Sequence, residues 1–255
     1  MFRLTFGIII AASLAGCAVS PDARAPQQTT ASPAPVVPDV MPDTMPAAVA
    51  AAEPDARASV RSLIAAVDAI EPVAEAMCRD RSPTLNCDFE FAIDMNPNAQ
   101  PNAFQTLDKS GRPLIAMTVA LLAETRNADE IAFILSHEAA HHIEGHLDRQ
   151  RRNATIGAAI MGQLVGLSDD PAVGRKAAEF GAAIGARTYS KDFELEADTL
   201  GTIIAAQAGY NPLRGADFFF RIPDPGNTFL GTHPANADRL RVVTRTAARL
   251  GFTNS

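Results

Sequence analysis

A histidine-rich segment near the middle of the chain constrains its fold more than any other feature. The protein has 255 residues and five histidines, and four of these lie within residues 137–146. Residues 137–142 read His-Glu-Ala-Ala-His-His and contain the pattern H-E-x-x-H. Apolar residues recur at intervals of three and four from Asp129 to Leu147, which predicts a helix across the pattern. A fold for this chain must therefore be built around that helix.

The spacing of the pattern suits a metal ion. His137 and His141 lie one helical turn apart, so both imidazoles can reach one cation. Glu138 is rotated by about 100° from His137 and therefore flanks the cation. The pattern is typical of a zinc site in which the glutamate is the general base for a metal-bound water. The alternative is a solvated helix face on which the histidines are ordinary polar residues.

A catalytic zinc ion needs a third protein ligand, and the same helix does not offer a good one. If the helix continues, His146 points away from His137. Glu144 shares the face of the two histidines but lies a further turn along the helix. A neighbouring helix is therefore the better source.

A second predicted helix, Ala186–Ala208, contains the sequence Glu-Leu-Glu-Ala-Asp. Glu194 and Asp198 are one turn apart and share a face, whereas Glu196 points elsewhere. One carboxylate of the pair can bind the metal ion, and the other can orient a histidine from outside. Two imidazoles and a carboxylate suit zinc, so we expect one Zn²⁺ ion per chain.

The composition excludes some classes of function. Lys and Arg total 22, Asp and Glu total 29, and the formal net charge is −7. No nucleic-acid partner is expected, because binding phosphates requires clustered cations. The chain has no Trp and two Tyr, so aromatic platforms for bases are scarce. No apolar run reaches the roughly 18 to 20 residues that a membrane-spanning helix needs.

The amino terminus has the pattern of an export signal. Arg3 precedes a short apolar run, and the segment ends in Leu-Ala-Gly-Cys at Cys17. This ending resembles the lipobox of bacterial lipoproteins, in which the peptide before the cysteine is removed and the cysteine is acylated. We therefore expect a signal peptide over residues 1–16 and a lipid anchor at Cys17. Residue 18 is Ala rather than Asp, and resemblance to the sorting rules of Gram-negative lipoproteins then implies the outer membrane, facing the periplasm, as the expected location. The alternative is an ordinary signal peptide with an incidental cysteine.

A linker is expected to follow the anchor. Residues 18–52 hold seven Pro and ten Ala, with no Gly and no aromatic residue. Such a segment buries too little apolar surface to offset the entropy of folding. We therefore assign residues 17–52 to the lipidated cysteine and a disordered Pro/Ala-rich tether, and residues 53–255 to a single catalytic domain.

Two further cysteines, Cys78 and Cys87, lie in the predicted catalytic domain. Export implies an oxidising compartment, which favours a disulfide between them. The alternative is a metal role, but their spacing fits no standard zinc ribbon.

The rest of the chain predicts an α+β fold that is mainly helical. Residues 56–77 have a helical period, and Phe89, Phe91 and Ile93 alternate as in a strand. A Ser-Gly-Arg-Pro turn suggests a β-hairpin around residues 110–113. Further helices are expected over residues 154–167, after Asp169, after Asn211 and over 234–250. The expected result is a zincin-like metalloprotease domain with a small sheet or hairpin beside the active-site helix.

Several segments, in this order along residues 56–250, carry a resemblance to a known family. They are Asn102-Ala103-Phe104, Ala128-Asp129-Glu130-Ile131-Ala132, H-E-x-x-H with Gly145-His146, S-K-D-F-E-L-E-A-D from Ser190, Gly209-Tyr210-Asn211-Pro212, and Thr232-His233-Pro234. In these the chain resembles the HtpX and CAAX prenyl-protease type zinc metallopeptidases, which are gluzincins, and most of all their exported BepA- and LoiP-like lipoprotein branch. Lys191 stands where that family usually has arginine. His142 stands where its members often have an apolar residue, and it is expected to be exposed or structural.

The resemblance implies a role for each site residue. It implies that His137, His141 and Glu194 are the zinc ligands. It also implies that Glu138 is the general base and that Asp198 is a supporting carboxylate. His233 would approach the metal from a loop, as a fourth ligand that keeps the enzyme latent or as an aid at the transition state. The alternative is a residue that only precedes a helix beginning at Pro234.

The expected function is that of a zinc-dependent metalloendopeptidase that hydrolyses misfolded or misassembled envelope proteins. The substrate is expected to extend beside residues 114–118. The alternative is a catalytically silent lipoprotein that serves as an adaptor or chaperone, with a structural zinc ion. Either version would have polypeptide partners, with the outer-membrane assembly machinery as a further candidate. Membrane remodelling by residues 154–167 is a third and weaker hypothesis.

Overall fold

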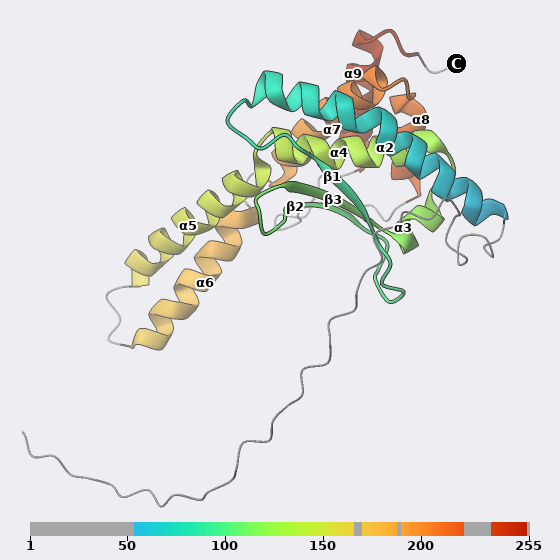
Figure 1. The fold of residues 1–255 in the computed structure, drawn as a ribbon. Helices are drawn as coiled ribbons and strands as arrows, with labels where there is room; N and C mark the ends of the chain where they lie inside the picture. Colours follow the sequence, from blue (N-terminus) through green and yellow to red (C-terminus); the bar gives the residue numbers. More distant parts are fainter. Residues whose placement is uncertain (1–53, 166–169, 188–189, 222–235, 254–255) are drawn as a thin grey trace, which may run out of the picture. The chain divides into compact units, whose positions relative to one another are not determined.

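The computed structural model describes residues 54–165, 170–187, 190–221 and 236–253, which have an α+β fold that is mainly helical (Figure 1). In chain order the elements are α2 (Pro54–Arg81), β1 (Glu90–Asp94), β2 (Ala103–Leu107), β3 (Pro113–Thr118), α3 (Val119–Glu124), α4 (Ala128–Ile143), α5 (His146–Val165), α6 (Pro171–Arg187), α7 (Ser190–Gln207), α8 (Pro212–Ala216), the 3₁₀ helix η1 (Asp217–Phe220) and α9 (Asn236–Arg249). The predictions for residues 1–52, including Cys17, and for His233 lie outside the described residues.

Within the described ranges, the strands form one mixed sheet in the order β1-β3-β2. β2 and β3 pair antiparallel, with Phe104 opposite Ala116, so the predicted hairpin is confirmed. β1 pairs with the other side of β3 in parallel, with Phe91 opposite Ile115. Both sides of β3 are thus hydrogen-bonded, and the prediction that a substrate extends beside residues 114–118 is wrong. β2, which contacts α4, is the edge strand next to the active-site helix.

The active-site helix α4 is shorter than its periodicity predicted. Its start is capped by Asn127, whose side chain accepts a hydrogen bond from the backbone N–H of Glu130 at 3.0 Å. Its end comes before Gly145, which has a φ of 66°, a conformation that glycine adopts readily. The predicted continuation to Leu147 is therefore wrong, and α5 leaves in a new direction from His146 (Figure 1).

Helix α7 packs directly against α4. A Cβ atom added at Gly201 would lie 2.9 Å from the Cα of His137, so only a glycine allows this approach. The helix ends before Gly209, as predicted. Its predicted start at Ala186 is wrong, because Ala186 belongs to α6 and α7 is described from Ser190.

Helices α5 and α6 pack on each other through small residues (Figure 1). A Cβ atom at Gly157 would lie 2.0 Å from the carbonyl oxygen of Gly181, and one at Gly185 would lie 2.0 Å from that of Asn153. Among the described residues, no helix combines the length and the apolar character needed to cross a bilayer.

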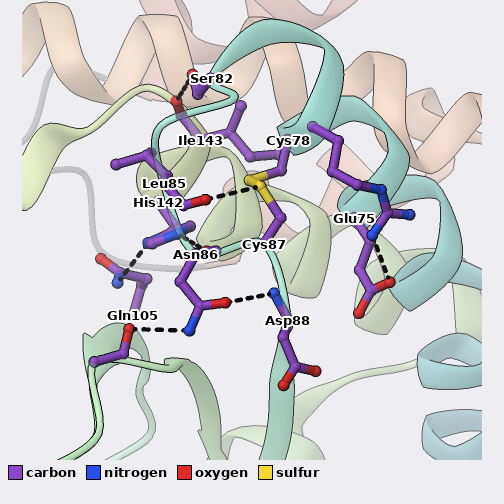
Figure 2. Close-up of a disulfide and its surroundings, with 12 residues drawn as sticks. Glu75, Cys78, Ser82, Leu85, Asn86, Cys87, Asp88, Gln105, His142 and Ile143 are labelled. Carbon is purple, nitrogen blue, oxygen red and sulfur yellow. Dashed lines mark hydrogen bonds and ion pairs between the residues drawn. A yellow bond between two sulfur atoms is a disulfide. The ribbon is translucent and has the colours of Figure 1, made fainter.

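A disulfide joins the end of α2 to the segment before β1 (Figure 2). It links Cys78 and Cys87, whose Cα atoms are 5.7 Å apart. Beside it, the backbone oxygen of Asn86 lies 2.8 Å from Nε2 of His142, and Nδ1 of His142 lies 3.4 Å from the Gln105 amide nitrogen (Figure 2). His142 is buried, so of the two expected alternatives, exposed or structural, the structural one holds.

Candidate metal centre

The three predicted ligands meet between α4 and α7. His137 and His141 project from one face of α4, and their Nε2 atoms are 3.0 Å apart. The carboxylate of Glu194 on α7 faces both rings, with Oε2 at 3.4 Å from Nε2 of His137 and Oε1 at 3.4 Å from Nε2 of His141. One ligand atom from each of the three residues therefore lies within 4.8 Å of the others.

These distances fit a zinc ion. Tetrahedral zinc with bonds of about 2.0 to 2.1 Å separates its ligand atoms by roughly 3.3 Å. The three separations measured here, 3.0, 3.4 and 3.4 Å, lie close to that value. The donor set of two imidazoles and one carboxylate is also typical of catalytic zinc, which keeps a fourth position for water.

Asp198 supports His137 from behind. Its Oδ1 lies 3.0 Å from Nδ1 of His137, and its side chain has no exposed surface. This fixes which ring nitrogen of His137 faces the ligand cluster, as carboxylates commonly do beside metal-binding histidines. The structure thus places Asp198 where the family resemblance implied a supporting carboxylate.

Arg239 of α9 completes this buried layer, and the sequence analysis missed it. Its Nε and Nη2 atoms donate to the two carboxylate oxygens of Asp198 at 2.8 and 2.7 Å, and its guanidinium lies 4.0 Å from the ring centre of Phe219. A signal was present in the sequence. Arg239 shares a helix face with Val243 and Ala247, so it is a charged residue within an apolar stripe.

His146 also belongs to the site, although a continuous helix predicted that it would point away. Because the chain turns at Gly145, the His146 ring reaches back to α4, and its Nδ1 lies 2.9 Å from Nδ1 of His141. Its Nε2 lies 3.0 Å from Oε2 of Glu196 on α7. The glycine at position 145 was the available signal for the turn.

Charge is shared unequally between the two ligand histidines. Burial and Arg239 lower the pKa of His137, but hydrogen bonds to Asp198 and Glu194 outweigh them and raise it to about 9. Burial and the positive charge of His137 lower the pKa of His141 to about 3. Burial raises the pKa of Asp198, but Arg239 overcomes this and holds that pKa below its usual value. At neutral pH without metal, the proton therefore rests on His137.

A cavity of about 690 Å³ opens over the ligand cluster. Glu138 lines it beside His137 and His141, so the predicted general base and ligands share one space. One wall comes from residues 100–105, which include most of edge strand β2. Apolar side chains of α3, α4 and η1 also line it, namely Leu121, Phe133, Ile134, Phe218 and Phe219. The cavity can therefore take an extended chain along β2 and an apolar side chain next to the cluster.

Comparison with known proteins identifies the family of the chain. The sequence pattern of Peptidase family M48 matches residues 69–247. Over 140 residues the chain is 29% identical to a beta-barrel assembly-enhancing protease of Vibrio cholerae. This match covers 49% of the chain and 29% of the relative. Over 157 residues it is 26% identical to the beta-barrel assembly-enhancing protease of Yersinia pestis. This second match covers 56% of the chain and 32% of the relative. The chain thus matches about a third of the length of these relatives.

Proposed function

Because the chain belongs to peptidase family M48, we propose that it is a zinc-dependent metalloendopeptidase that cleaves misfolded or misassembled proteins of the bacterial envelope. The observation that carries the proposal is the meeting of His137, His141 and Glu194 at ligand distances beside Glu138, in a cavity that also reaches an edge strand. A site with only a structural role would have no need of a carboxylate at position 138 in that cavity.

The residues divide the reaction among them. A bound zinc ion would supply Lewis acidity and lower the pKa of a water molecule at the fourth position. Glu138 would take the proton from that water and pass it to the leaving amine. Asp198 and Arg239 hold His137 in place, so that its Nε2 faces the cluster.

Edge strand β2 offers a way to hold the substrate. An extended peptide can add to a free strand edge through main-chain hydrogen bonds, which depend little on its sequence. Phe104 on β2 is 37% exposed and lines the cavity, so it could contact substrate side chains. Recognition of this kind suits unfolded segments, which expose their backbone.

The envelope location rests on two further observations. The relatives are named for beta-barrel assembly, which makes the outer-membrane assembly machinery a candidate partner. The Leu-Ala-Gly-Cys ending at Cys17 supports a lipid anchor that faces the periplasm. The adaptor hypothesis remains the second candidate, favoured by the word assembly in those names.

The test is a comparison of the full chain with its Glu138→Gln variant. We expect the variant to bind one zinc ion as the wild type does and to lose cleavage of casein or of an unfolded outer-membrane protein. Both should also be made with His233→Ala, so that any latency imposed by His233 is removed. Retained cleavage by Glu138→Gln would overturn the assignment of the base. Zinc binding without cleavage in both the wild type and the His233→Ala protein would favour the adaptor.

A further inference from the structure

We infer that His146 and Glu196 are positioning residues, which hold His141 in the tautomer that presents Nε2 to the metal ion. The inference rests on the proposed function, because it concerns the same metal site. It differs from the support of His137 by Asp198, since it acts on the other histidine through a second imidazole.

The three side chains form one line of hydrogen bonds. Nδ1 of His141 lies 2.9 Å from Nδ1 of His146, and Nε2 of His146 lies 3.0 Å from Oε2 of Glu196. The line begins at the metal ligand on α4, passes through the first residue of α5 and ends on α7.

When the His146 ring is neutral, proton accounting along this line leaves one arrangement. A carboxylate only accepts hydrogen bonds, so Nε2 of His146 must carry the proton that is donated to Glu196. In a neutral imidazole the other nitrogen is then an acceptor, and Nδ1 of His146 must accept from Nδ1–H of His141. Nε2 of His141 is therefore left without a proton, and this is the atom that lies 3.4 Å from the Glu194 carboxylate.

The His146 ring is held firmly enough to impose this choice. It is 4% exposed and stacks on Phe193, with ring centres 4.7 Å apart and an angle of 10° between the planes. Arg149 lies over the same phenylalanine at 4.2 Å and also pairs with Glu196. The carboxylate at the end of the line is thus kept charged by a cation.

One segment of α7 therefore supplies three acidic side chains to the metal site. Glu194 faces the two ligand histidines, Asp198 contacts His137 directly, and Glu196 reaches His141 through His146. Glu196 points away from the other two acids on the helix. It contributes because Gly145 turns the chain and brings His146 between α4 and α7.

The test measures the zinc dissociation constant of the full chain by competition with a chromophoric chelator. We expect His146→Leu, which removes the acceptor, to weaken zinc binding by about 10- to 100-fold. His146→Asn should restore most of the affinity, because its side-chain oxygen can accept from Nδ1–H of His141. Asparagine does not restore the stacking on Phe193, so recovery separates hydrogen bonding from packing.

His142→Leu is the matched control. It removes a buried histidine from the next position of α4, whose hydrogen-bond partners are Asn86 and Gln105 and whose ring packs on Phe89. We expect its zinc affinity to stay within about twofold of the wild type. Should His146→Leu fail to fold, His146→Asn and Glu196→Ala carry the test, with little loss expected for the first and a loss of affinity for the second.

Two results would overturn the inference. One is a His146→Leu protein that binds zinc as tightly as the wild type, and the other is a folded His146→Asn protein as weak as His146→Leu. Both results presuppose that the wild type binds zinc. A wild type that binds no zinc would instead contradict the proposed function, so the two failures are distinguishable.

Discussion

Arg239 and Asp198 form a two-point ion pair behind the ligand cluster, with Nε 2.8 Å from Oδ2 and Nη2 2.7 Å from Oδ1. Asp198 also holds Nδ1 of His137 at 3.0 Å. Three helices, α9, α7 and α4, are therefore joined at one buried point. Zinc binding and the packing of α9 should depend on each other for this reason.

The first prediction concerns this pair. Arg239→Leu removes the guanidinium from the buried Asp198 carboxylate, and breaking a buried ion pair in this way typically costs about 3–5 kcal/mol of folding free energy. We expect a large fall in the urea midpoint and weaker zinc binding. Arg239→Lys should recover little, because a single ammonium cannot match the planar two-point contact.

Arg241→Leu is the control for this substitution. Arg241 lies on the same helix but is exposed and pairs with Asp238 at i,i+3. Its loss should change the free energy of unfolding by no more than about 0.5 kcal/mol. If the two substitutions lowered the free energy of unfolding equally, the buried pair would contribute no more to stability than the exposed one.

The second prediction concerns the contact between α4 and α7. In Gly201→Ala the new methyl group would lie 2.9 Å from the Cα of His137 and 3.0 Å from its N, so the helices must move apart. Overpacking of this kind costs about 1–3 kcal/mol. The shift would also carry Glu194 away from the histidines, so we expect weaker zinc binding by chelator competition.

Gly162→Ala in α5 provides the comparison, because nothing lies within 4 Å of the added atom. There alanine should stabilise the helix by about 0.5–1 kcal/mol. If Gly201→Ala behaves in the same way as Gly162→Ala, the close approach of α7 does not limit the site.

The third prediction concerns protons released on metal binding. Because the pKa of His137 is raised to about 9 without metal, the residue is protonated at pH 7.5 and must lose that proton to become a ligand. Zinc affinity should therefore rise with pH up to about 9. Titration calorimetry in buffers of different ionisation enthalpy should show roughly one proton released per zinc ion at pH 7.5. A heat of binding that is independent of the buffer would contradict this.

The sequence predicted the parts of the site that depend on one helix. The spacing of His137 and His141, and that of Glu194 and Asp198, is local and follows from the helical period. The period did not reveal the break at Gly145, because Leu147 follows Ile143 at a spacing of four and so continues the helical pattern past the glycine. The contribution of His146 was lost for that reason.

Contacts between distant segments were harder to predict. The central place of β3 depends on a parallel partner that precedes the hairpin, and no local pattern specifies that pairing. Arg239 was missed because its importance comes from Asp198, which lies 41 residues earlier in the chain. A charged residue in an apolar stripe can be recognised from sequence, but its partner is known only from the fold.

The last prediction concerns the disulfide. Cys78 and Cys87 are nine positions apart in the sequence, and closing a loop of that length stabilises a protein by about 2–3 kcal/mol. Reduction should lower the free energy of unfolding by that amount. The loop also carries Asn86, which contacts His142, so the reduced protein should show faster amide exchange in the part of β2 around Gln105. The Cys78→Ser/Cys87→Ser double variant is the control and should not respond to the reductant. If adding the reductant lowered the stability of that variant by a similar amount, the effect would come from something other than this bond.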